Sequence, residues 1–206
     1  MSSNRRTSQA RRGLSHRAAL AALMAVALMV SAECRADSKQ GPTQISSNLV
    51  GISPMQAPSG PAPIRTLDDL AGLTASQLET LYRQGGPGPV PSGKVQGLAL
   101  YPESRFPRAK AKAARVAWQG KVFDPQTSTA TNRFFGLRAI KGNVYSGQSW
   151  LDGGPSMILD YQNTSKIYGN YRDEIRQIAP GFYLGLMHDR TTNPPTFKMY
   201  FAFTDQ

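Results

Sequence analysis

The stretch from Asn143 to Arg190 decides the fold: NVYSGQSWLDGGPSMILDYQNTSKIYGNYRDEIRQIAPGFYLGLMHDR. It contains four short runs in which apolar and polar residues alternate. Asp152-Gly153-Gly154-Pro155 separates the first two runs, and Ala179-Pro180-Gly181 separates the last two. Glycine and proline at these places are typical of hairpin turns. The stretch therefore predicts two β-hairpins, and it contains no catalytic motif.

The same alternation begins at Val116 and continues almost to the end of the chain. It predicts seven short strands in up-and-down order, at 118–123, 133–140, 144–151, 156–161, 172–178, 182–189 and 197–203. On the last strand, Phe197, Met199, Phe201 and Phe203 share one face, which we expect to be core. The predicted fold class is mainly β: a small antiparallel up-and-down, lipocalin-like barrel or a strongly curled sheet, with one or two N-terminal capping helices.

Helix signals precede the strands. Thr74 and Gln77 have the spacing of a capping box, and Leu73 can pack against Leu78 as a hydrophobic staple, so a helix is predicted at 75–84. Thr66 with Asp69 predicts a shorter helical turn just before it.

The N-terminal part of the chain looks like an export signal followed by a linker. An uncharged run from Ala18 to Val30 follows two arginine pairs, and it is shorter than the roughly 20 residues that a membrane-spanning helix needs. We predict a cleaved signal peptide at 1–36, a Pro/Gly/Ser linker at 37–65 and a single domain at 66–206, in a periplasmic or secreted protein. Sec and twin-arginine export both remain open, and Glu33 before Cys34 argues against a lipoprotein signal.

Composition excludes several classes of site. The chain carries 24 basic and 13 acidic residues, and removal of residues 1–36 leaves 18 basic and 12 acidic, which is a mildly basic surface. Cys34 is the single cysteine, so neither an intramolecular disulfide nor a thiolate metal cluster is expected. We predict no cofactor, no metal and no nucleic-acid partner.

The segment from Arg105 to Lys121 contains six basic residues and no acidic one. Pro107 suits the first position of a helix, and the apolar residues Phe106, Ala109, Ala113 and Val116 fall on one face of it. The segment is either the solvated face of a helix that caps the domain or a contact for an anionic membrane surface.

Candidates for catalysis are isolated. Ser149 lies in a sequence that resembles the start of a nucleophile elbow, but Leu151 replaces the second glycine. His188 is the one histidine outside the predicted signal peptide, and it could act as a lone general base. A hydrolase acting on small ester or lipid substrates is therefore an alternative that we rank below a binding protein.

A ligand site inside the barrel is the main functional prediction. A sheet closed around a core buries alternate residues, so one of the charged pairs formed by Asp160 or Glu174 with Arg172 or Arg176 could point inward. Such a pair is either an internal salt bridge or the polar anchor of an amphiphilic, lipid-like ligand with a polar or acidic head. Aromatic residues from successive strands would surround the apolar body. The predicted ligand-binding residues are Trp118, Trp150, Asp160, Arg172, Glu174, Arg176 and Tyr183, with Phe135, Tyr161 and Phe201 as further aromatic candidates.

Several of these residues lie in a pattern that resembles a bacterial family. Ala117-Trp118-Gln119-Gly120, Ser149-Trp150-Leu151-Asp152-Gly153, and the passage from Asp173 to Gly185 are similar to bacterial proteins of the GXWXG type, although Val116 occupies the position of the motif's first glycine. The resemblance implies a lipocalin-like barrel and a small-ligand role. The alternative role is structural, as an envelope-interaction protein with a packed barrel.

Overall fold

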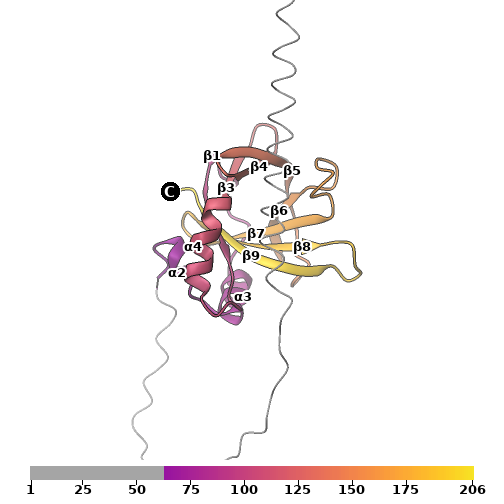
Figure 1. Ribbon diagram of the computed structural model, residues 1–206. Helices are drawn as coiled ribbons and strands as arrows, with labels where there is room; N and C mark the ends of the chain where they lie inside the picture. The colour runs from indigo at the N-terminus through magenta and orange to yellow at the C-terminus, as the bar shows by residue number, and fades with distance from the viewer. Residues whose placement is uncertain (1–62) are drawn as a thin grey trace, which may run out of the picture.

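The computed structural model describes residues 63–206, so the predicted signal peptide and nearly all of the predicted linker lie outside the described residues. The described part contains three helices and nine strands (Figure 1). The helices are α2 (Leu67–Leu70), α3 (Ala75–Gln84) and α4 (Pro107–Ala117). The strands are β1 (Gly93–Lys94), β2 (Gln96–Leu100), β3 (Trp118–Asp124), β4 (Thr129–Phe134), β5 (Leu137–Gln148), β6 (Pro155–Asp160), β7 (Tyr171–Ala179), β8 (Phe182–Asp189) and β9 (Thr196–Thr204).

The nine strands form one antiparallel sheet that curls into a nearly closed barrel. The strand order is β1-β3-β4-β5-β6-β7-β8-β9-β2, so strands β3 to β9 follow one another up and down. The two edge strands are neighbours in the chain and are separated by Val95 alone. β1 pairs with β3 and β2 pairs with β9, so the segment 93–100 joins the two edges of the sheet. The predicted mainly β, antiparallel barrel is confirmed.

A close backbone contact forms the seam of the barrel. Val95 N donates to Lys121 O at 3.0 Å. A Cβ atom added at Gly97 would lie 2.5 Å from the Cα of Gly120, and Gly120 has φ +112°. Both residues must be glycine here, because any side chain would separate the crossing strands.

Two details of the predicted strands were wrong. The strand predicted at 133–140 is the hairpin between β4 and β5, which turns at Phe135 (φ 50°) and Gly136 (φ 80°). Two consecutive residues with positive φ make the tight turn that suits the strand twist, but phenylalanine gives no such signal in the sequence. Strands β1 and β2 were not predicted, since Gln96–Leu100 lies between loops and shows no alternation.

The helices begin as the sequence predicts. Thr74 accepts a hydrogen bond from Gln77 N, and the Gln77 side chain accepts one from Thr74 N at 2.9 Å, which completes the capping box of α3. The shorter helix α2 starts with the equivalent pair, Thr66 and Asp69. Figure 1 shows the three helices gathered on one side of the barrel, where α2 contacts β9, α3 contacts β7, and α4 contacts β2 and β3.

Apolar residues are buried on both faces of the strands that lie under the helices. Inside the barrel, Phe203 stacks on Tyr183 with ring centroids 4.8 Å apart and also contacts Phe123. On the outer face, Leu78 and Tyr82 of α3 are fully buried. None of the helices in the described part of the chain is long and apolar enough to cross a membrane.

Candidate functional site

Strand β7 carries buried polar residues on both of its faces. Its sequence Arg172-Asp173-Glu174-Ile175-Arg176 is buried at every position. Side chains alternate across a strand, so Asp173 lies on one face while Arg172, Glu174 and Arg176 lie on the other. Asp173 pairs in register with Leu159 and Met187 and points into the barrel, where it lines a cavity. The three other charged residues lie on the outer face, and each takes part in a polar cluster there.

The inner cluster is built around the buried amine of Lys121. Lys121 Nζ donates to Asn132 Oδ1 at 2.9 Å, to Tyr161 OH at 3.1 Å and to Asp173 Oδ2 at 2.9 Å. Tyr161 OH in turn donates to Asp173 Oδ2 at 2.7 Å and accepts from Asn132 Nδ2 at 2.9 Å. The indole of Trp118 donates to Asn132 Oδ1 at 3.0 Å. We call these five residues the inner cluster.

Burial and charge oppose one another at Lys121. Burial lowers the pKa of the Lys121 amine, while the Asp173 carboxylate acts to raise it. Burial also raises the pKa of the Tyr161 hydroxyl well above its ordinary value, and the negative charge of Asp173 raises it further. Tyr161 therefore stays neutral and can donate to the carboxylate.

The hydrogen-bonding groups of the inner cluster are used almost completely. All three donors of the Lys121 ammonium have acceptors, and Asn132 uses both donors, toward Tyr161 OH and Ile140 O. Asp173 differs from the rest, because both of its hydrogen bonds reach Oδ2. Within residues 63–206, no hydrogen bond reaches Asp173 Oδ1. The cluster can therefore accept a further hydrogen bond but has no free cationic donor.

A small cavity lies against this cluster. Its volume is about 30 Å³, enough for about one or two water molecules. The side chains of Met187 and Met199 line it together with aromatic walls from Trp118, Phe134, Tyr161, Tyr168 and Phe201. Methionine is unbranched and adopts several conformations readily, so these two residues form the part of the wall that can move most easily.

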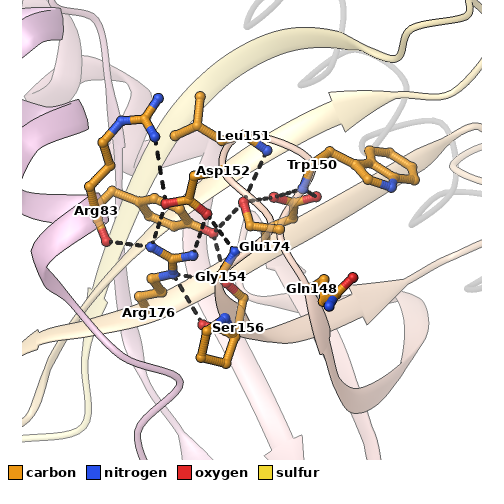
Figure 2. Close-up of polar contacts among 12 residues, drawn as sticks. Arg83, Gln148, Trp150, Leu151, Asp152, Gly154, Ser156, Glu174 and Arg176 are labelled. Carbon is orange, nitrogen blue, oxygen red and sulfur yellow. Dashed lines mark hydrogen bonds and ion pairs between the residues drawn. The ribbon is translucent and has the colours of Figure 1, made fainter.

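On the outer face, Glu174 holds the loop that follows β5. Its carboxylate accepts from Ser149 Oγ at 2.5 Å and from Trp150 N at 2.9 and 3.0 Å (Figure 2). The same carboxylate pairs with Arg172 at 3.1 Å. Glu174 is fully buried, so these contacts supply the compensation that a buried carboxylate needs.

Arg176 joins the same loop to helix α3. Its guanidinium forms a bidentate pair with Asp152, at 2.6 and 2.9 Å, and also donates to Tyr82 O at 3.1 Å (Figure 2). Its Nε donates to Ser156 Oγ at 2.9 Å, and the guanidinium lies 4.4 Å from the centroid of the Tyr82 ring. The hydrogen bonds from Arg176 lower the pKa of Asp152. Glu174, Arg176 and their partners form the outer cluster, and its geometry is that of a structural clamp.

Trp150 covers the edge of the outer cluster. Trp150 is 41% exposed, and its ring centroid lies 4.1 Å from the Arg172 guanidinium. His188 contacts the same ring edge-on, with centroids 5.8 Å apart. Burial lowers the pKa of His188, the nearby Glu174 acts to raise it, and the net shift is downward. Arg172 Nε and His188 Nδ1 are buried without hydrogen-bond partners in the described part of the chain.

The seven predicted ligand-binding residues thus divide between the two faces. Trp118 and Tyr183 lie inside the barrel, and Tyr183 OH donates to Pro89 O at 3.0 Å. Asp160 ends strand β6 and pairs with Arg190 at 2.6 Å, on the same face as Arg172. The expectation that Arg172 or Arg176 points inward with Asp160 or Glu174 was wrong. The further aromatic candidates Tyr161 and Phe201 line the inner cavity, whereas Phe135 lies at an exposed turn. The residues that the structure brings together inside the barrel are Trp118, Lys121, Asn132, Tyr161 and Asp173.

Sequence reasoning missed Lys121 and Asn132 as parts of a site. The sequence placed Lys121 in the basic surface segment. A register shift between Trp118 and Gly120 turns Trp118 and Lys121 to the same face, which strict alternation does not predict. The two-residue spacing from Lys121 to the apolar Phe123 is the signal that could have identified it. Asn132 carries no comparable signal, because Thr-Asn-Arg in a strand is equally compatible with an exposed face.

Ser149 and His188 do not form a nucleophile and base pair. Ser149 is 3% exposed, and its hydroxyl donates to Glu174. His188 approaches Glu174 with Nδ1 3.7 Å from the carboxylate, rather than approaching the serine. Across residues 63–206, no group of three or more His, Cys, Asp and Glu side chains is arranged to hold a metal ion.

Comparisons with known proteins do not identify a family. No family model matches the chain, and no curated protein matches it. Among solved structures, a protein from Thermomonospora curvata is similar to this chain, with 20% sequence identity and a TM-score of 0.44 over 66% of this chain and 89% of that one. The resemblance to proteins of the GXWXG type stays a prediction.

Proposed function

We propose that this protein is an exported binding module that holds a small amphiphilic molecule inside its β-barrel. One observation carries the proposal: Asp173 Oδ1 has no hydrogen-bond partner in the described residues, and Asp173 lines an internal cavity walled by aromatic and methionine side chains. An acceptor that the described residues leave free at this cavity can take a hydrogen bond from a molecule that brings a donor.

The inner cluster suggests which head the ligand carries. The donors of Lys121 are all used by neighbouring acceptors, and the open atom belongs to a carboxylate. An acidic head would meet like charge at Asp173, whereas a hydroxyl or primary ammonium could donate to it. Of the polar or acidic head expected from the sequence, we therefore keep the polar head that can donate a hydrogen bond and drop the acidic one.

The apolar body of the ligand needs more room than the 30 Å³ cavity offers. Known ligand pockets are roughly ten times larger or more. Met187 and Met199 line the cavity, and their unbranched side chains can change conformation more readily than the aromatic walls can. Binding therefore requires displacement of these two methionines.

The two tryptophans allow ligand binding inside the barrel to be tested by fluorescence. Trp118 lines the cavity and Trp150 lies outside the barrel, so Trp150→Phe leaves a single reporter beside the site. Titration of this variant with fatty alcohols, alkyl amines and fatty acids should give a saturable fluorescence change. Met199→Phe, which fills the cavity, should abolish it while thermal unfolding stays cooperative. Absence of a saturable change across the panel would favour the alternative, a packed barrel with a structural or envelope-interaction role.

Export is proposed from the sequence, on the apolar run that follows the arginine pairs. N-terminal sequencing of the periplasmic or secreted protein should find a start near Glu33 or Asp37. An exported chain that still begins at Met1 would contradict cleavage.

The hydrolase alternative is tested with simple esters as substrates. Turnover that is lost in Ser149→Ala or His188→Ala would show that the protein is a hydrolase and would contradict the binding proposal.

A further inference from the structure

Helix α4 packs against the barrel with the face opposite to its apolar stripe. Ala111 is its buried residue, and α4 contacts β2 and β3. Phe106, Ala109, Ala113 and Val116 are all exposed, with Phe106 at 65% and Val116 at 67%. Successive helical residues are about 100° apart, so Ala109, Ala113 and Val116 form one stripe that points away from the protein, and the exposed N-cap residue Phe106 stands at its start. We call it the α4 stripe.

Basic side chains flank the α4 stripe. At about 100° per residue, Lys110 and Lys112 lie on its two opposite sides. Lys112 is exposed, and Lys110 lies 4.2 Å from the centroid of the Tyr101 ring. Arg115 is held by Asp68 at 3.2 Å, and helix α4 itself contains no acidic residue. Lysine stems beside an apolar stripe can keep their ammonium groups at a phosphate layer while the stripe enters the lipid.

The turn between β4 and β5 extends this surface. Phe135 N donates to Ala117 O at 3.0 Å, which fixes the turn beside the end of the helix. Phe135 is 48% exposed and Leu137 is 37% exposed, and Arg133 and Arg138 flank them. Phe135 also adopts φ 50°, a conformation that glycine or asparagine adopts more easily. A strained, exposed phenylalanine at the tip of a turn is not explained by packing and points to a contact made with another body.

We infer that the α4 stripe and the β4–β5 turn form a docking surface for an anionic lipid bilayer. The apolar residues would enter the headgroup layer, and the basic residues would meet lipid phosphates. Lys121, which the sequence placed in the same basic segment, is buried in the barrel and takes no part. Glu103 precedes α4 in the sequence and Asp68 pairs with Arg115, and neither residue belongs to the stripe.

Vesicle co-sedimentation of the purified protein tests the inference. Binding to phosphatidylcholine vesicles that contain phosphatidylglycerol should exceed binding to phosphatidylcholine alone, and salt should weaken it. Lys110→Gln/Lys112→Gln should reduce binding about 30-fold, from about 1 kcal/mol for each basic residue near the surface. Val116→Ser/Phe135→Asn should also reduce binding severalfold. Asparagine suits the positive φ at position 135, so this variant should keep or raise the melting temperature.

A matched control removes the same charge elsewhere. Lys94→Gln/Lys141→Gln changes two exposed lysines away from α4 and should bind as the unaltered protein does. Three outcomes would overturn the inference. The first is no binding to either vesicle. The second is binding that depends on the lysines but not on Val116 and Phe135, which would indicate a polyanion site. The third is a protein that does not bind vesicles but self-associates, with the self-association abolished by Val116→Ser/Phe135→Asn.

Discussion

The two faces of strand β7 carry clusters of similar composition in different surroundings. Inside the barrel, Asp173 pairs with a lysine that is as buried as itself. Outside, Arg176 pairs with Asp152, whose side chain retains 15% exposure, and the pair joins a loop, a helix and two strands. A structural role accounts for the outer cluster, because each of its contacts connects two segments of the chain.

The inner cluster also connects segments, because Lys121 on β3 bonds to Asp173 on β7 and three strands lie between them in the sheet. It differs from the outer cluster in lying at a cavity inside the barrel. Buried ion pairs contribute little net stability compared with apolar residues of similar size. We therefore propose that the lysine and the aspartate at the cavity serve in recognition. The comparison predicts that removing one residue of a charged pair will lower the free energy of unfolding more inside the barrel than outside it.

The largest effect is expected for Lys121→Met. The substitution leaves the Asp173 carboxylate buried without its cation, which should lower the free energy of unfolding by about 3–5 kcal/mol. Urea unfolding measures the loss. The double variant Lys121→Met/Asp173→Leu should recover most of it, because no buried charge remains. A double variant as unstable as the single one would show that the pair itself stabilises the fold.

A smaller loss is expected for Arg176→Met on the outer face. Several acceptors lose their donor, but Asp152 can turn toward water, so the cost should be about 2 kcal/mol. The same urea measurement applies, with Arg83→Met as a control that removes the more distant and exposed partner of Asp152. If Arg176→Met lowered the free energy of unfolding more than Lys121→Met does, the predicted difference between the two faces would be wrong.

The smallest expected effect is a change in the stability of the fold with pH. The pKa of His188 is lower in the folded protein than the ordinary value of 6.5, mainly because the ring is buried. The unfolded chain then binds more protons just below that value, so stability should fall as the pH drops below about 6.5. His188→Gln should flatten this part of the profile. An unchanged slope in urea midpoints between neutral and mildly acidic pH would show that His188 is not its source.

Much of the fold could be predicted from the sequence because its signals are local. Thr74 with Gln77 fixes the start of α3, and Pro180-Gly181 fixes the turn between β7 and β8. The site could not be predicted in the same way. Arg172 to Arg176 are buried on both faces, since helix α3 and the loop after β5 cover the outside of the barrel. A strand with no exposed face offers no alternation from which to decide that Asp173, rather than Glu174, points inward.

Discrimination between two head groups tests the central claim most directly. With the Trp150→Phe variant, the dissociation constants of a fatty alcohol and of the fatty acid with the same chain length are measured by Trp118 fluorescence at neutral pH. An open Asp173 oxygen predicts tighter binding of the alcohol, by about tenfold or more for a buried hydrogen bond gained and a charge repulsion avoided. Tighter binding of the fatty acid would contradict the account and would mean that Lys121 presents its charge to the ligand.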